Sequence, residues 1–339
     1  MIEFRRLVES SRYLDPFRNF EPFEARAEIR WDPLTGLTAR IMNFPARKPS
    51  RFDPAPAVAA SVAARCPFCD ENIDAMTARL DPAMFGSEQL RDGEVRIIPN
   101  LLAFDKYSLV AIICREHYLD MAALADRGSV VKGIEALVRV FRKVREKDGD
   151  ARYCSLNCNY MPMSGGSLVH PHVQGIAGEC PTNYQRIMIE KSRDFSREKK
   201  AVFWDALEEE ETRLGERAVG RTGAIFWYTP FAPKGNIDVG CVFRAPSVFA
   251  LEDADWADFG RGFNKVLSYL DGENVAGFNL SIFSAPEGED HFRANGRIVA
   301  RRFLPPVSAA DVSYFEKLHM ESACMVAPEH VALRLRELW

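Results

Sequence analysis

The stretch Ser164-Gly165-Gly166-Ser167-Leu168-Val169-His170-Pro171-His172-Val173-Gln174 holds two of the six histidines of this 339-residue chain, separated by a single proline. Residues two apart in an extended segment point to the same face, and Pro171 biases His170 toward an extended backbone. The two imidazoles and the amide of Gln174 are therefore predicted to share one surface. The small residues at 164–167 let a backbone approach a ligand closely and offer N–H and hydroxyl donors, which suits a phosphate group.

The overall composition is that of a globular protein without an unusual charge. Hydrophobic residues make up 47% of the chain and charged residues 27%, with a net charge of −4, so nothing global indicates nucleic acid or a membrane surface as a partner. The chain is longer than one hydrophobic core usually accommodates. Its first residues lack an apolar core of signal-peptide length, and no apolar run reaches the length of a membrane span. We therefore expect a cytoplasmic protein with more than one domain.

The periodicity of apolar residues predicts the same order of elements in both halves of the chain. Strands are predicted at residues 23–31, 37–44, 95–98, 109–114, 151–157, 170–177, 224–229, 237–243, 278–282 and 297–303, and helices at 130–144, 256–270 and 328–339. A turn at 32–36 joins the first two strands, and a long polar helix at 181–214 connects the halves. Because strand, strand, helix, strand occurs twice, we predict an α+β fold built from a duplicated unit, with antiparallel sheets flanked by helices.

The only closely spaced cysteine pair is Cys66-Pro67-Phe68-Cys69, among eight cysteines that are otherwise scattered. A long chain with no secretion signal is expected to keep its thiols reduced. Cysteines at i and i+3 can grip one tetrahedral metal ion, and His117 and His170 could complete a Cys₂His₂ set. Four protein ligands leave no open position, so such an ion is structural. The alternatives are a half-buried thiol pair with unrelated histidines, or a redox pair, although the alanine-rich residues 57–64 do not resemble the strand that precedes a thioredoxin-type motif.

If His170 binds a metal ion, His172 remains free beside it. A neutral imidazole is a good nucleophile toward an activated phosphorus. The backbone carbonyl of His170 could fix the tautomer of His172 and aim its other ring nitrogen at a substrate. Ser167, Gln174 and the Gly165-Gly166 amides are suited to stabilise charge on phosphoryl oxygens. The alternative is that His172 is a structural histidine with satisfied hydrogen bonds.

Four blocks of the sequence resemble, in the same order, the galactose-1-phosphate uridylyltransferase branch of the histidine-triad superfamily. They are Asp32-Pro33-Leu34-Thr35-Gly36; Cys66-Pro67-Phe68-Cys69; Pro99-Asn100 through Glu116-His117; and Asn159 through Gly165, Ser167, His170-Pro171-His172 and Gln174. Their joint occurrence is far more specific than any one motif. The second half matches more weakly, around Phe231-Ala232-Pro233 and Ala327-Pro328-Glu329.

The resemblance implies two histidine-triad-like domains, at residues 1–215 and 216–339, with the second degenerate, and a homodimer. It implies that His172 attacks the α-phosphorus of a nucleotide sugar, and that a sugar phosphate or inorganic phosphate then takes over the nucleotidyl group. By matching position, Cys66, Cys69, His117 and His170 would bind a structural zinc ion. Phosphate and nucleotide contacts would come from Asn100, Asn159, Gly165, Ser167 and Gln174, joined by Arg47 and Arg51 from a basic loop whose arginine spacing differs from the family's.

Gln174 bears on the type of reaction that the resemblance implies. Hydrolases of the superfamily place a third histidine at this position, whereas transferases have glutamine, so transfer to phosphate is favoured over transfer to water. UDP-hexose and hexose 1-phosphate are the expected substrates, and an ADP-sugar or dinucleoside-polyphosphate phosphorylase is the alternative. A zinc-stabilised nucleotide-binding protein without turnover is an alternative of another class. Glu316 and Glu321 are candidates for contacts to the sugar, and no set of residues for a second metal ion is recognisable.

Overall fold

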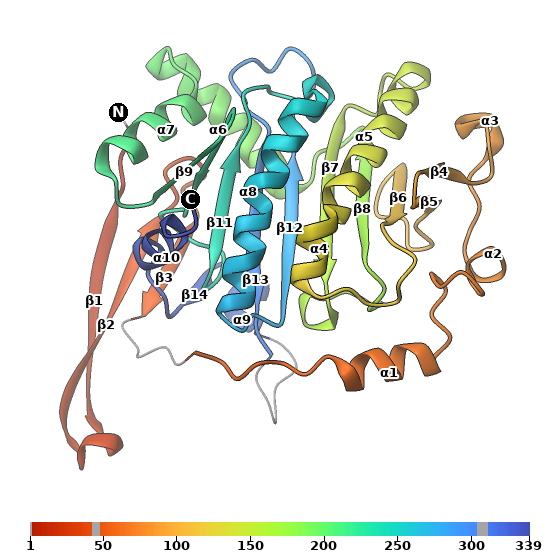
Figure 1. Ribbon diagram of the computed structural model, residues 1–339. Helices are drawn as coiled ribbons and strands as arrows, with labels where there is room; N and C mark the ends of the chain where they lie inside the picture. The colour runs from red at the N-terminus through yellow and green to blue at the C-terminus, as the bar shows by residue number, and fades with distance from the viewer. Residues whose placement is uncertain (1, 43–47, 304–310) are drawn as a thin grey trace.

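A ten-stranded sheet, in which every neighbouring pair of strands is antiparallel, forms the centre of the molecule (Figure 1). This computed structural model describes residues 2–42, 48–303 and 311–339. Across the sheet the strands are β4 (Leu90–Asp92), β5 (Val95–Pro99), β6 (Tyr107–Ile112), β8 (His172–Gly178), β7 (Tyr153–Tyr160), β12 (Gly277–Phe283), β13 (Asn295–Arg301), β11 (Asp238–Val242), β10 (Ile225–Tyr228) and β9 (Ala218–Thr222). The predicted α+β class with antiparallel sheets is confirmed.

The two halves of the sheet repeat one strand order outward from its middle. From β7 the order is β8, β6, β5, β4, and from β12 it is β13, β11, β10, β9. The halves join where β7 and β12 pair, with Asn159 opposite Asn279 and Asn157 opposite Ser281. One uninterrupted sheet therefore runs through both halves. The domain boundary at 215/216, which falls between the end of a helix and β9, stays a prediction.

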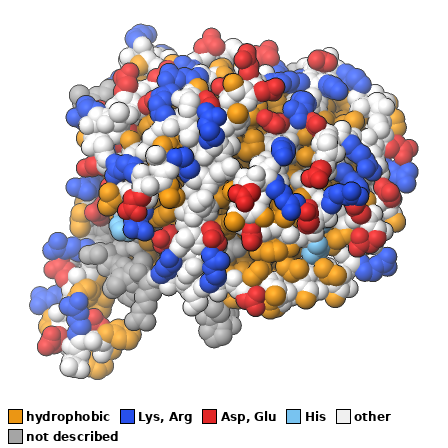
Figure 2. Space-filling model, in the orientation of Figure 1, with side chains coloured by type: hydrophobic (Ala, Val, Ile, Leu, Met, Phe, Trp, Pro, Cys, Tyr) orange, Lys and Arg blue, Asp and Glu red, His pale blue; other side chains and the backbone are white. Residues whose placement is uncertain are grey.

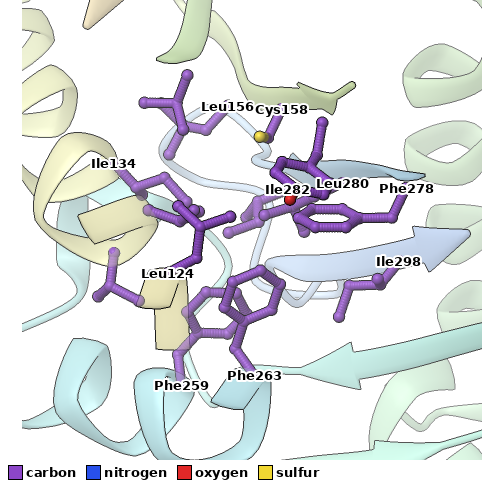
Figure 3. Packing of buried hydrophobic residues seen from close by; sticks show 14 of the residues in the cluster. Leu124, Ile134, Leu156, Cys158, Phe259, Phe263, Phe278, Leu280, Ile282 and Ile298 are labelled. Atoms are coloured by element: carbon purple, nitrogen blue, oxygen red, sulfur yellow. The ribbon is translucent and has the colours of Figure 1, made fainter. Parts of the chain in front are cut away.

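Three helices cover one face of this sheet: α4 (Met121–Arg127), α5 (Ser129–Lys147) and α8 (Asp253–Gly272) (Figure 1). Along α5 and α8 the apolar residues recur at helical spacing, so each helix turns one stripe toward the strands. Figure 3 shows the result, with Ile134 of α5 and Phe263 of α8 packed against Leu156 and Phe278 of the two central strands. The main core is thus shared by the two halves, and on the opposite face the two central strands carry polar residues.

The connection between the halves consists of two helices, α6 (Asn183–Lys199) and α7 (Phe203–Leu214), so the prediction of one helix over 181–214 was wrong. A capping box of Thr182 and Gln185 starts α6. The break comes at Lys200, which takes the left-handed conformation (φ 56°) that ends a helix. Hydrophobic residues of α6 and α7 pack with Phe226, Tyr228 and Val242 of the second half, on the side away from α8.

A second, four-stranded sheet has the order β1-β2-β3-β14. Its strands are β1 (Arg6–Asp15), β2 (Glu21–Trp31), β3 (Thr38–Met42) and β14 (Ser322–Cys324). The predicted hairpin is present as β2 and β3, but β1 was not predicted; it pairs with β2 over ten residues to form a ribbon that projects from the body (Figure 1). The remaining helices are α1 (Ala55–Ala63), α2 (Ile73–Met76), α3 (Pro82–Phe85), α9 (Tyr314–Leu318) and α10 (Pro328–Arg336), with 3₁₀ turns at Pro16–Arg18, Pro162–Ser164 and Val248–Ala250.

The surface on the side of α5 and α8 carries charges of both signs, interspersed without a large region of one sign (Figure 2). Among the described residues, no helix combines the length and apolarity that crossing a membrane requires.

Candidate active site and metal centre

The two cysteines and two histidines named from the sequence come together as a cluster. The candidate ligand atoms of Cys66, Cys69, His117 and His170 all lie within 4.8 Å of one another. Cys66 and Cys69 flank a tight turn closed by a backbone hydrogen bond, whereas His117 follows β6 and His170 precedes β8. Because β6 and β8 are neighbours in the sheet, histidines from these two connections reach the same point. Within the described part of the chain this is the one such group.

The donor set and its surroundings fit a soft divalent metal ion. Nδ1 of His117 lies 3.2 Å from Sγ of Cys69, and Nδ1 of His170 lies 3.7 Å from it. Nε2 of His170 donates a hydrogen bond to the carbonyl of Cys114 at 3.0 Å, which leaves the Nδ1 lone pair facing the cluster. Burial is the main cause that raises the pKa of the Cys69 thiol to about 12. The negative charges of the neighbouring Cys66 and Glu71 raise it further. A thiolate at this position therefore needs a cation such as a metal ion beside it.

His172 is held in one tautomer by the backbone. Its Nδ1 lies 2.8 Å from the carbonyl oxygen of His170. A carbonyl only accepts, so Nδ1 carries the hydrogen and the lone pair is on Nε2. The residue is 5% exposed, and burial lowers the pKa of its imidazole, which favours the neutral form. Phe68, between the two cysteines, packs edge-on against the ring at 5.3 Å, a contact that the sequence interpretation missed. The result is a neutral imidazole with a fixed reactive nitrogen.

The open side of His172 faces a cavity of about 290 Å³. Gln174, two residues along β8 on the same face, places Nε2 of its amide 3.4 Å from Nε2 of His172. Ser167, Asn100 and Thr77 line the same cavity. The remaining lining is apolar: Pro67, Phe68, Met76, Ala78, Ile98, Pro99, Leu101, Leu102, Val110 and Leu168. The cavity thus combines the polar groups of His172 and Gln174, which lie together, with a largely apolar lining that suits a flat apolar or aromatic group.

The loop before β8 approaches the sheet closely. Gly165 has φ +88°, a backbone conformation that favours glycine. A Cβ on Gly166 would lie 3.4 Å from the carbonyl oxygen of Asn159, so the small residue lets the loop lie against β7. Asn159 is half-buried at this contact, and its side-chain oxygen accepts a hydrogen bond of 2.6 Å from Asn279. The sequence interpretation named Asn159 and Gly165, but it did not find Asn279.

Three further candidates from the sequence, Arg51, Glu316 and Glu321, do not line this cavity. Arg47 lies outside the described residues. Arg51 lines a different cavity, of about 470 Å³, and forms an ion pair of 2.8 Å with Asp271. Glu316 caps the start of α9 by accepting from Ser313, and Glu321 pairs with Arg40 at 3.0 Å. Arg51, Glu316 and Glu321 are thus engaged in contacts away from His172.

The second half carries different chemistry at the equivalent positions. Asn295 begins β13 as His172 begins β8, and Arg297 follows it as Gln174 follows His172. Arg297 forms a buried, two-pronged ion pair with Asp238 of β11. The space there, lined in part by α6 and α7, measures only about 20 Å³. An ion pair thus fills the second-half counterpart of the candidate site.

Comparison with known proteins agrees with this architecture. No family model matches the chain. An uncharacterized protein of Archaeoglobus fulgidus is 31% identical over 338 residues, which covers 100% of this chain and 99% of that protein. Among solved structures, an ADP-glucose phosphorylase from Arabidopsis thaliana with bound ADP-glucose has a TM-score of 0.68 at 18% identity, over 92% of this chain and 98% of that one. A uridylyltransferase has a TM-score of 0.64 at 22% identity, over 91% and 98%.

Proposed function

We propose that this protein, which belongs to one family with the Archaeoglobus fulgidus protein and has the fold of the galactose-1-phosphate uridylyltransferase family, is a nucleotidyltransferase that works through a covalent nucleotidyl-histidine. One observation supports this most directly. His172 is a buried, neutral imidazole whose Nδ1 is held by a carbonyl and whose Nε2 opens onto a cavity with Ser167 and Gln174. A metal site or a nucleotide pocket alone would not require a fixed nucleophile of this kind.

In the first half-reaction, Nε2 of His172 attacks the α-phosphorus of a nucleotide sugar. A nitrogen–phosphorus bond forms, the bond from that phosphorus to the bridging oxygen breaks, and the sugar 1-phosphate leaves with its electron pair. The imidazole becomes cationic, and the hydrogen bond from Nδ1 to the carbonyl of His170 becomes charge-assisted. Donors from Ser167, Gln174 and the Gly165-Gly166 backbone would stabilise the phosphoryl oxygens.

In the second half-reaction, an oxygen of an acceptor phosphate attacks the same phosphorus and the nitrogen–phosphorus bond breaks. The nucleotidyl group passes to the acceptor, and His172 returns to its neutral form. The amide of Gln174 next to Nε2 can orient phosphoryl oxygens but cannot act as a base toward water. That residue therefore favours a phosphate acceptor over hydrolysis.

The metal in this proposal is a zinc ion held by Cys66, Cys69, His117 and His170. When bound, it supplies structural rigidity and no open coordination position. Cys66 and Cys69 hold the knuckle that presents Phe68 to the imidazole of His172, and His170 supplies the carbonyl that sets its tautomer. We also propose that the protein works in the cytoplasm as a homodimer.

UDP-hexose with hexose 1-phosphate as acceptor is our first candidate for the substrates. The second is transfer of an adenylyl group from an ADP-sugar to phosphate. Both candidate substrates remain compatible with the cavity, because its largely apolar lining offers few polar side chains to distinguish one base from the other. The solved structure with bound ADP-glucose supports the second candidate.

The test is intact-protein mass spectrometry after brief incubation with UDP-glucose or with ADP-glucose, in the absence of an acceptor. A mass increase of one UMP, lost in His172→Gly, is the expected result. An AMP adduct would keep the mechanism and make the protein an adenylyltransferase. The exposed His330 provides a matched control, because His330→Gly should form the adduct as the wild type does. Absence of an adduct with either donor, together with nucleotide-dependent thermal stabilisation, would replace this proposal with a binding protein without turnover.

A further inference from the structure

A row of polar side chains crosses the line where the two halves of the sheet pair. On β7 and β12 these residues are Asn157, Asn159, Asn279 and Ser281, on the face opposite α5 and α8. Nδ2 of Asn279 lies 2.6 Å from Oδ1 of Asn159 and 2.8 Å from the carbonyl oxygen of Ser164. The second half thus contacts both the β7 residue and the glycine-serine loop of the candidate active site through a single amide.

The orientation of the Asn279 amide is fixed by a charge. Nη1 of Arg301, on the adjacent strand β13, lies 2.9 Å from Oδ1 of Asn279. A guanidinium has only donors, so the atom that faces it must be the amide oxygen. Arg301 is itself held by Asp311 at 2.7 Å, and both side chains are about 85% buried, being 15% and 16% exposed. The NH₂ group of Asn279 therefore has to point toward Asn159 and Ser164.

This orientation determines what Asn159 offers to a ligand. Because Asn279 donates, the atom of Asn159 that faces it must be the oxygen. The NH₂ group of Asn159 is then turned away from β12, and it donates to none of the other described residues. Gly166 lies against the same residue on the loop side, because a Cβ at position 166 would be only 3.5 Å from Cβ of Asn159. Asn159 thus keeps an amide donor free beside the loop that the sequence predicts to bind phosphate.

We propose that Asn279 is a positioning residue of the second half, which with Arg301 turns the amide of Asn159 so that its NH₂ group faces the phosphates of the nucleotide donor. The inference rests on the proposed function for the identity of the ligand. The chain of contacts from Asp311 through Arg301 and Asn279 to Asn159 contributes no group that reacts. These contacts make Asn159 present its NH₂ donor, and not its oxygen, at the position where the negative charge of the substrate is expected.

The test compares Asn279→Asp with Asn279→Ala. A carboxylate accepts only, so in Asn279→Asp the Asn159 amide must turn round and present its oxygen to the phosphate. The alanine variant merely releases Asn159, which can still turn its NH₂ group to a ligand. We expect the KM for the nucleotide donor to rise about 10-fold in the alanine variant and about 100-fold in the aspartate variant, the range of hydrogen bonds to charged groups. We expect the Tm of the aspartate variant to equal or exceed that of the alanine variant, because Arg301 pairs with the new carboxylate.

That ordering separates positioning from a structural role, in which the nearly isosteric aspartate would be the milder change. Ser281→Ala is the matched control on the same strand and face; Ser281 bonds to Asn157 at 2.8 Å, and its loss should leave KM unchanged. Arg301→Gln, a second variant that keeps Asn279, should raise KM several-fold. Equal KM values for Asn279→Asp and the wild type, or a larger effect in Asn279→Ala, would overturn the inference.

Binding of UMP and AMP by calorimetry distinguishes failure of this inference from failure of the proposed function. If the wild type forms no covalent adduct but binds either nucleotide, the proposed reaction is wrong, and the same ordering of affinities among the variants still decides the role of Asn279. Absence of binding of both nucleotides to the wild type would overturn both proposals.

Discussion

His170 and His172 stand two residues apart, yet their hydrogen bonds give them different chemistry. His170 donates from Nε2 to the carbonyl of Cys114 and turns Nδ1 toward the cysteines. His172 donates from Nδ1 to the carbonyl of His170 and turns Nε2 toward the cavity. The two rings are thus held by opposite nitrogens. One backbone carbonyl links the candidate metal ligand directly to the candidate nucleophile.

Replacement of His172 by glycine tests the nucleophile. We expect turnover to fall by at least about 10⁴-fold, because the described residues that line the cavity include no second imidazole to form the bond to phosphorus. The metal content and the circular dichroism spectrum should stay those of the wild type, since His172 is not among the four clustered ligands. Full activity in this variant would exclude the mechanism.

Replacement of Cys66 by alanine tests the metal centre. Cys66 is buried, and three ligands should hold the ion poorly, so we expect metal content to fall from about one ion per chain to near zero and the Tm to fall with it. The control is Cys180→Ala, which removes an exposed thiol. Plasma mass spectrometry measures the metal, and an unchanged content in Cys66→Ala would remove this residue from the site.

The spatial grouping of candidate residues could be predicted from sequence where the geometry is local, while their roles stay predictions. The spacing of His170, His172 and Gln174 places these side chains together, whatever the rest of the fold does. The position of Arg51 could not be predicted in this way, because the sequence does not fix where a basic side chain in a loop points. In the structure Arg51 forms an ion pair with Asp271 of α8. Asn279 could not be found either, because it is one asparagine in an ordinary strand, and its importance comes from a pairing across the two halves.

At the scale of elements, α10 joins the ribbon to the body through one carboxylate. Glu329, in the first turn of α10, pairs with Arg30 of β2 at 2.7 Å and with Arg217 at 3.1 Å. Burial opposes ionisation of Glu329, but the hydrogen bond and charge of Arg30, followed by Arg217, lower its pKa below the ordinary 4.5. The pair therefore stabilises the folded protein while Glu329 is ionised.

The sign of this shift predicts an acid dependence. A carboxyl group with a lowered folded pKa stabilises the protein above about pH 4.5 and loses that contribution as the pH falls through the lowered value. Glu329→Gln should therefore lower the free energy of unfolding by about 1–3 kcal/mol at pH 7 and by much less near pH 3. Urea unfolding at the two pH values measures this difference. An equal loss of unfolding free energy at both pH values would show that the charge of Glu329 is not the cause of the stabilisation.

The end of α6 offers a stabilising substitution. Lys200 has φ 56°, and the backbone N–H of this residue caps the helix by bonding to the carbonyl of Ser196. Glycine adopts this conformation without the strain imposed by a Cβ, so Lys200→Gly should stabilise the protein by about 0.5–1 kcal/mol. Lys199→Gly, one residue earlier and inside the helix, should destabilise it by a similar amount. If the two variants shifted the Tm in the same direction, this account of the break would be wrong.

Strands and helices were predictable from sequence where one face is buried. The apolar residues recur at helical spacing along α5 and at every second position along β12. These patterns identify the two elements because the core covers one side of each and determines the spacing of the apolar residues. The strand β1 was missed because all but the last of its residues are exposed and no alternation is imposed on them. The break at Lys200 was missed because lysine is not a residue that usually ends a helix in this way.

At the scale of the whole molecule, both halves share one core and one sheet, so they should unfold together. Ile134→Ala removes a buried side chain from α5 and should cost about 2–5 kcal/mol. We expect it to shift the unfolding monitored by Trp227 and Trp256 in the second half as much as the unfolding monitored by circular dichroism. Leu318→Ala, at an exposed position, should shift neither. Two separate transitions would show that the halves unfold independently.

The repeated order of elements was visible in the sequence, but the way the halves meet was not. Each half supplies five antiparallel strands in which the last strand of the chain segment lies between the third and the fourth. Nothing in the sequences of β7 and β12 indicates that these two strands pair with each other. That pairing is decided by the combined burial of α4, α5 and α8 over both strands. The fold class could therefore be predicted, whereas the single sheet had to be observed.

The junction of β7 and β12 also limits how such a gene can change. Separated from its companion, either half would carry a full-length unpaired strand edge, a surface prone to associate with other chains. Neither half is then a module that recombination can transplant into another protein. The reactive first half and the second half, which has Arg297 in the place that Gln174 takes in the first, are therefore expected to be inherited as a unit. The second half is free to lose its own chemistry as long as it keeps covering that edge.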